Sequence, residues 1–153
     1  MQVYQNHQAL DTVVNRMNRL LAGYQMYYQN LRGFHWNIRG KDFFEMHALF
    51  EQWYDEAAGH IDEIAERILT LGAIPLHTFE DYITYSPVAL QKHIDRSAPA
   101  VQSVKEALEI LLAEEREILK LAAENGDEGT VAMMSEYIAL QEKRLWMLGA
   151  YLA

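Results

Sequence analysis

The chain contains no cysteine, so disulfide bonds and thiolate metal ligands are both excluded. It also lacks any apolar run approaching the ~18 residues that a membrane span requires. The first ten residues carry neither a basic region nor an apolar stretch, so we expect no secretory signal peptide and no membrane attachment. A cytoplasmic location is the default expectation for such a chain.

Clusters of basic residues are absent as well. The 13 Lys and Arg residues are scattered and are outnumbered by 22 acidic residues, which gives a formal net charge of −9. Such a surface repels the phosphate backbone, and neither end of the sequence carries a lysine-rich tail, so DNA binding is not expected. The length of 153 residues, half of them apolar, indicates a single domain over residues 1–153.

What the chain has is helical periodicity. Four long segments repeat apolar residues at spacings of three and four, and none alternates as a strand would. Asp42 with Glu45 resembles a capping box before the second segment, and Gly72 follows its end. In the long connection over residues 73–98, Ser86-Pro87 predicts a short helix from Val88 to about His93. The pattern is that of an all-α, ferritin-like four-helix bundle, with the short helix in the crossover between helices 2 and 3.

The second helical segment carries four metal-ligand side chains. At 100° per residue, with His47 at zero, Glu51 lies at roughly 40°, Asp62 at roughly 60° and Glu66 at roughly 100°. His47 and Asp62 are nevertheless separated by about 22 Å along a straight helix, so one copy cannot close a metal site. Two antiparallel copies related by a two-fold axis would place His47 opposite Glu66 and Glu51 opposite Asp62.

The centre of that crossing is occupied by Ala57, Ala58 and Gly59, which are small enough for two backbones to approach closely. The alternative is a core histidine at position 47 and solvated acids. No Glu-x-x-His motif occurs, which disfavours a di-iron site within one bundle. Two histidines with carboxylates suit Fe(II), with Zn(II) or Mn(II) as substitutes. The other histidines are expected in solvated or capping positions: His7, His60, His77 and His93.

The densest part of the sequence resembles a known family signature. It resembles the Dps family of ferritin-like mini-ferritins through His35-Trp36-Asn37, Gly40, Phe43, His47, Phe50, Tyr54, Asp62, Ala65-Glu66-Arg67, Leu71-Gly72 and Pro75. The resemblance implies a hollow homo-dodecamer with ferroxidase sites at its two-fold interfaces. It also implies that Fe(II) is oxidised, preferentially by hydrogen peroxide rather than oxygen, and stored as a ferric mineral, which protects against oxidative damage.

The same resemblance assigns roles to individual residues. It makes His35 and His47 the imidazole ligands from one subunit and Asp62 and Glu66 the carboxylate ligands from its partner. Glu51 stands where the family usually has Asp, as a fifth ligand. Trp36, beside His35, is either an electron donor to the iron site or a packing residue.

The family also builds an acidic pore near the turn before the last helix. Asp127 and Glu128 lie at this turn, with Glu124 just before it, and they are the candidate pore residues. Asp127 has a second interpretation as an ordinary helix N-cap.

Two alternative functions remain open on the sequence. One is a nucleoid-type structural protein that protects DNA by coating it. The other is a metal-buffering shell that binds zinc at the same ligands without redox turnover, because divalent affinity orders favour Zn over Fe at many nitrogen and oxygen sites.

Overall fold

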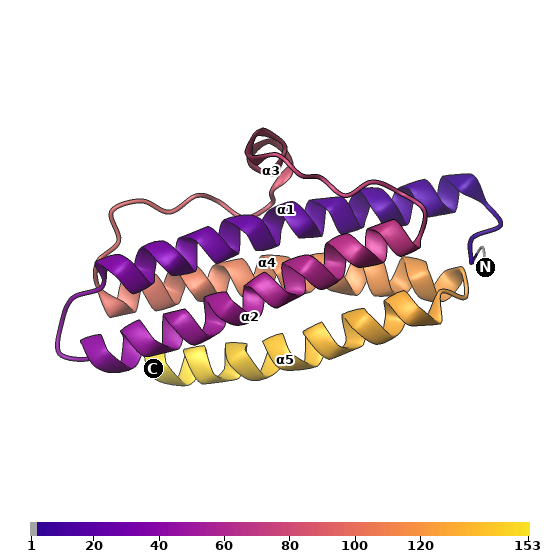
Figure 1. Ribbon diagram of the computed structural model, residues 1–153. Helices are drawn as coiled ribbons and strands as arrows, with labels where there is room; N and C mark the ends of the chain where they lie inside the picture. The colour runs from indigo at the N-terminus through magenta and orange to yellow at the C-terminus, as the bar shows by residue number, and fades with distance from the viewer. Residues whose placement is uncertain (1–2) are drawn as a thin grey trace.

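The regular secondary structure of the described chain is helical. The computed structural model describes residues 3–153, so expectations that include Met1 and Gln2 lie outside the described residues. Five helices follow one another: α1 (His7–Asn37), α2 (Phe43–Thr70), α3 (Phe79–Tyr85), α4 (Ser97–Glu124) and α5 (Glu128–Leu152) (Figure 1). Residues 3–153 contain no strand. The expected all-α four-helix bundle with an additional short helix is confirmed.

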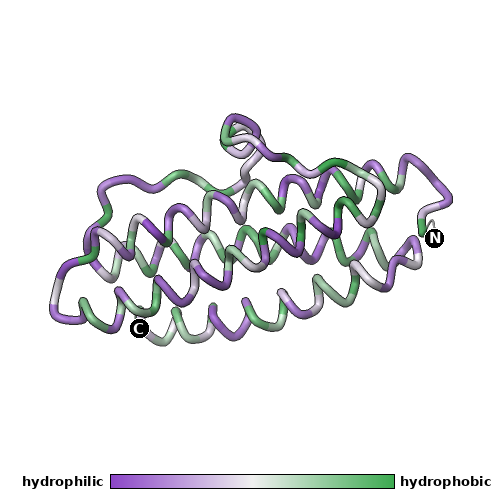
Figure 2. Tube along the Cα trace, viewed as in Figure 1, coloured by the Kyte–Doolittle hydropathy of each residue, from purple (hydrophilic) through white to green (hydrophobic). Residues whose placement is uncertain are grey.

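The four long helices bury one face each. Figure 2 shows apolar and polar residues alternating along them at a helical repeat. Helix α1 packs against α2 and α4, and α4 packs against α5. Large side chains that are almost completely buried come from all four helices; examples are Met17, Leu21, Phe50, Ile64, Leu111, Ile118 and Met134. This burial drives the bundle together.

The crossover from α2 to α4 runs along the outside of α1 and carries α3 (Figure 1). The short helix predicted over residues 88–93 is wrong, because helix α3 spans Phe79–Tyr85 instead. Thr78 caps it by accepting a hydrogen bond from the Asp81 N–H at 3.2 Å. Ser86 forms a local turn with Val88, whose N–H donates to the Ser86 hydroxyl while that hydroxyl donates to the Val88 carbonyl. The Ser86 side chain therefore forms a turn at the position where the predicted helix would have begun.

Asp42 lies at the N-cap position of α2, but its side chain does not form the predicted capping box. The carboxylate instead accepts hydrogen bonds from Ser97 at 2.6 Å and from Tyr151 at 2.9 Å. Asp42 therefore joins the starts of α2 and α4 to the end of α5. The charge-assisted bond to Ser97 outweighs a local cap here.

Polar side chains bridge α2 and α5. Arg144 binds Glu56 and lies over the Trp53 ring, and Tyr137 donates a hydrogen bond to Glu63. These side-chain contacts between the two helices fix the register of α2 against α5. Within residues 3–153, no helix has both the length and the apolar character that crossing a membrane requires.

Candidate metal centre

Two histidines meet where α1 ends and α2 begins. His35 lies in the last turn of α1 and His47 in the second turn of α2, and the short connection 38–42 folds one against the other. Their imidazole rings are stacked, with centroids 3.7 Å apart and planes 12° from parallel. The His35 residue is 8% exposed, and His47 is half-buried.

The two histidines hold each other through reciprocal hydrogen bonds. His35 Nδ1 lies 2.7 Å from the backbone carbonyl oxygen of His47, and His47 Nδ1 lies 2.7 Å from the carbonyl oxygen of His35. A carbonyl oxygen only accepts, so each Nδ1 must carry the hydrogen and donate it. The Nε2 of each neutral imidazole then keeps its lone pair. This is the outer contact that orients metal-binding histidines in proteins generally.

Aromatic rings flank the pair on both sides. Phe43 stacks on His47 with ring centroids 4.8 Å apart, and Tyr54 meets the His35 ring edge to face at 5.4 Å. Tyr54 in turn contacts Tyr28 at 5.9 Å. These contacts restrict rotation of both imidazoles, which keeps their Nε2 atoms in position.

The candidate carboxylates lie on the outward face of α2. The buried residues of this helix, such as Phe50 and Ile64, lie at roughly −60° to −120° from His47 on the helical wheel, well away from Glu51, Asp62 and Glu66. Glu51, Asp62 and Glu66 are all exposed. The structure therefore points them away from the bundle core.

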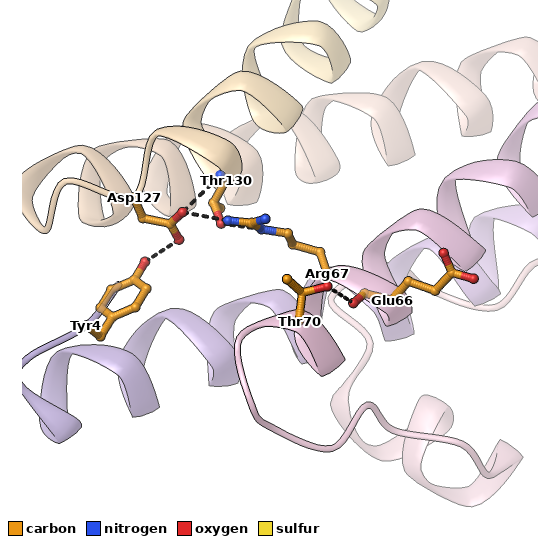
Figure 3. Close-up of polar contacts among 6 residues, drawn as sticks. All are labelled: Tyr4, Glu66, Arg67, Thr70, Asp127 and Thr130. Atoms are coloured by element: carbon orange, nitrogen blue, oxygen red, sulfur yellow. Dashed lines mark hydrogen bonds and ion pairs between the residues drawn. The ribbon is translucent and has the colours of Figure 1, made fainter. Parts of the chain in front are cut away.

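Glu66 illustrates this arrangement. Its backbone carbonyl accepts a hydrogen bond from Thr70 at 2.8 Å, whereas its carboxylate points away from the neighbouring Arg67 (Figure 3). The carboxylate is free for a ligand outside its own chain.

One chain holds two separated halves of the predicted ligand set. Within residues 3–153, no three His, Asp or Glu side chains gather closely enough to hold a metal ion. Between the two halves, Ala58 is exposed, and a Cβ added at Gly59 would meet no atom within 4 Å. The glycine thus has no packing role within its own chain, although a helix interior disfavours it by about 1 kcal/mol relative to alanine.

Trp36 lies next to His35 but points outward. It is 58% exposed, and the guanidinium of Arg32 lies 4.9 Å from its ring centroid. The same guanidinium lies 5.3 Å from the Tyr28 ring. The indole is therefore held at the surface by a cation–π contact and has no packing role in the core.

The candidate pore residues separate into two kinds. Glu124 and Glu128 are exposed at the α4–α5 turn. Asp127 is buried: it accepts hydrogen bonds from the Thr130 N–H at 3.1 Å, from Arg67 at 2.7 Å and from the Tyr4 hydroxyl at 2.7 Å (Figure 3). The structure gives Asp127 the helix-cap role that the sequence left open.

The surroundings of Asp127 include partners that the local sequence pattern does not reveal. Burial opposes ionisation, but the hydrogen bonds from Thr130 and Tyr4 and the charge of Arg67 lower the pKa of the Asp127 carboxyl below its usual range. A Cβ at Gly129 would lie 2.6 Å from a guanidinium nitrogen of Arg67, so this glycine makes room for the ion pair. The cluster joins the N-terminal segment, the end of α2 and the start of α5.

His60 differs from its expected solvated role. Its ring packs 4.5 Å from the Tyr137 ring and 5.7 Å from that of Tyr24. Burial lowers the pKa of this imidazole, so the neutral form is favoured. His60 belongs to the centre of the bundle and lies apart from the outward face of α2.

Comparisons with known proteins identify the family. A model described as a ferritin-like domain matches residues 14–153. A DNA protection during starvation protein of Porphyromonas gingivalis is 46% identical over 94% of this chain and 91% of its own length. The chain belongs to the Dps family of ferritin-like proteins. DNA protection during starvation protein 2 of Bacillus anthracis is 33% identical over 92% of this chain and 96% of its own length.

Solved structures share the fold over nearly the whole chain. The Dps protein of Vibrio cholerae, described as a member of the ferritin-like diiron-carboxylate superfamily, superposes with a TM-score of 0.94 at 46% identity, covering 95% of this chain and 92% of its own. Antigen TpF1 of Treponema pallidum gives a TM-score of 0.95 at 29% identity over 99% and 98% of the two chains. The histidine pair and the outward carboxylates therefore lie on a Dps fold.

Proposed function

We propose that this Dps-family chain is a ferroxidase that oxidises Fe(II), with hydrogen peroxide as the preferred oxidant, and stores the ferric product inside a hollow homo-dodecamer. Iron is the substrate and the cargo. One observation carries the proposal. Each chain has a locked histidine pair with free Nε2 lone pairs and a set of exposed carboxylates on α2. Within one chain the two groups are too far apart to bind the same metal ion.

A second copy of α2 would complete the site. In an antiparallel crossing at Ala58 and Gly59, His35 and His47 of one chain face Asp62 and Glu66 of the other, giving two equivalent sites per dimer. Such isologous pairing is the commonest symmetry of homo-oligomers. Glu51 lies one turn beyond His47 on the same face and supplies a further carboxylate. Imidazole and carboxylate ligands suit Fe(II), and zinc is the expected competitor.

Exposed apolar surface between α1 and the crossover also supports assembly. Phe79, Ile83 and Leu90 are each more than half exposed. With Tyr28 and Arg32 they line a groove of about 370 Å³ between the crossover and α1. An exposed apolar patch of this kind is typical of an interface, and a second copy of this chain is the occupant that the proposed dimer provides.

The chemistry balances with peroxide as the electron acceptor. Two Fe(II) ions give one electron each, and hydrogen peroxide with two protons becomes two waters. The residues of the proposed site would hold the iron that is oxidised, and reduction of peroxide by two electrons avoids the one-electron cleavage that releases a hydroxyl radical. Trp36 follows His35 in the sequence and is exposed, which supports a role as an electron donor to the proposed iron site.

The test is anaerobic loading of Fe(II) followed by peroxide or oxygen, with ferric absorbance and particle mass followed together. We expect rapid oxidation, faster with peroxide, with iron retained in a particle of dodecameric mass. Stoichiometric binding without oxidation would overturn the proposal and favour the metal-buffering alternative. Retardation of duplex DNA at physiological salt would favour the DNA-coating alternative, which the net charge of −9 opposes.

A further inference from the structure

The centre of the bundle contains a polar cluster that the proposed iron site does not use. Tyr24 of α1 donates a hydrogen bond to Glu115 Oε2 of α4 at 2.8 Å, and Gln141 Nε2 of α5 donates to the same oxygen at 2.9 Å. Glu115 is 0% exposed and Gln141 is 2% exposed. Buried carboxylates are rare unless they are paired with a charge or a metal.

Within residues 3–153, Glu115 takes part in no ion pair. Among the ion pairs of residues 3–153, Arg144 binds Glu56, and the arginines nearest along α1 bind Glu114. The groups that face the cluster are tyrosine hydroxyls, a half-buried imidazole, two carboxylates and one arginine that is already paired to one of those carboxylates. By element they are Tyr24 and Tyr27 of α1, Glu56, His60 and Glu63 of α2, and Tyr137 and Arg144 of α5. An ionised Glu115 would therefore be a buried charge without a counter-ion, which is strongly unfavourable.

In the described part of the chain, three buried oxygens in or beside the cluster lack a hydrogen-bond partner, and one of them is the Tyr27 hydroxyl. Glu115 Oε1 and Gln141 Oε1 are both buried and unpaired, although the other ends of the same two side chains are bonded to each other. An acceptor left unpaired in this buried position has lost its hydrogen bonds to water without a replacement, which is unfavourable. A hydrogen on Glu115 Oε1 would turn an acceptor into a donor and give the Gln141 oxygen a partner.

We propose that Glu115 and Gln141 form a proton-binding site at the centre of the bundle, in which Glu115 is a neutral carboxylic acid that donates its O–H to the Gln141 side-chain oxygen. The ligand of this site is a single proton. Burial, opposed by the hydrogen bonds from Tyr24 and Gln141, raises the pKa of Glu115 to about 8. The site is therefore occupied at neutral pH and empties as the solution becomes alkaline.

The proton has a consequence for metal binding. Ferritin-like bundles place their metal ligands on facing helices in the bundle core, which is where Tyr24, His60, Glu115 and Gln141 converge here. Metal ions bind only deprotonated carboxylates, so the proton on Glu115 competes with a cation for the same oxygens. The protonated pair therefore disfavours metal binding at the bundle centre. Fe(II) is left to the proposed site on the outward face of α2.

Infrared spectroscopy of the assembled protein tests this proposal. The carbonyl stretch of a protonated carboxylic acid is separated from carboxylate and amide bands, and at about pH 6.5 ordinary Asp and Glu side chains are ionised. We expect one protonated-acid band in the parent chain, lost as the pH rises through about 8. The band should be absent from Glu115→Gln and unchanged in Glu109→Gln, a matched change at an exposed site of the same helix.

A second variant keeps the test decisive if Glu115→Gln fails to assemble. Tyr24→Phe removes a hydrogen bond that favours the ionised acid, so the band should persist to higher pH. Absence of a protonated-acid band at about pH 6.5 in the parent would overturn the proposal. So would a band that survives Glu115→Gln, or one whose loss with pH is unaffected by Tyr24→Phe. None of these outcomes depends on iron oxidation.

Discussion

His35 and His47 each donate from Nδ1 to the other's backbone carbonyl oxygen, and both Nδ1–O distances are 2.7 Å. Neither imidazole can rotate without breaking its own bond and disturbing the stacked neighbour. The pair therefore forms a preorganised unit whose two Nε2 atoms are available to a ligand.

Replacing His47 with Phe tests the function of that unit. Phenylalanine preserves a ring between Phe43 and His35 but removes both the carbonyl contact and the Nε2 lone pair. The initial rate of Fe(II) oxidation should fall by at least ~10-fold while helicity and particle mass persist. His77→Phe, which changes an exposed loop histidine, is the control and should keep the parental rate. Equal rates in both variants would remove His47 from the site.

Ala58→Phe tests the proposed crossing of two α2 helices. Ala58 is exposed in the chain, so the larger ring disturbs no packing within the bundle. Between two closely crossed helices it should cost about 1–3 kcal/mol per site by overpacking. Sedimentation should show loss of dimers and larger particles, with helicity retained. Ala113→Phe, an exposed site on α4, controls for added apolar surface; parental assembly of Ala58→Phe would place the crossing elsewhere.

The Asp127 cluster should dominate stability at its end of the bundle. Asp127→Ala removes the cap of α5 and leaves Arg67 without its buried partner, so the free energy of unfolding should fall by at least ~2 kcal/mol. Asp95→Ala removes an exposed partner of Arg39 and should cost at most ~1 kcal/mol. Urea unfolding of the two variants gives the comparison. Similar losses would mean that the buried cluster adds nothing beyond a surface ion pair.

Glu115 should give stability an unusual dependence on pH. Folding raises the pKa of this carboxyl to about 8, so the folded chain keeps a proton that the unfolded chain has released above its ordinary pKa. The contribution of Glu115 is complete at acidic pH and falls as pH rises toward about 8, by up to about 1.4 kcal/mol per pH unit. Unfolding midpoints between about pH 5 and 8 should decline more steeply in the parent than in Glu115→Gln. Parallel profiles would contradict this expectation.

The face of α2 could be read from the sequence because a straight helix converts spacing directly into direction. His47, Glu51, Asp62 and Glu66 needed no tertiary information to be placed on one side. The missed position of α3 had a local signal, since Thr78 and Asp81 form a cap pattern that the Ser86-Pro87 dipeptide outweighed.

Other features depend on residues that the fold brings together from distant positions. The Arg67–Asp127 pair and the Glu115–Gln141 pair join different helices, and no periodicity within one helix points to them. The reciprocal histidine bonds depend on how residues 38–42 turn. Local pattern therefore predicts the candidate ligands, whereas their orientation requires the three-dimensional structure.

The central claim is that each iron site is shared between two chains, and mixing two inactive variants tests it most directly. One variant carries His35→Ala with His47→Ala, and the other carries Asp62→Ala with Glu66→Ala. A chain of each kind, paired, rebuilds one intact site and loses the other, so a random equal mixture should recover about one quarter of the parental initial rate, while each variant alone stays near background. Mixed particles that contain both chains yet oxidise iron no faster than either variant alone would contradict the shared site.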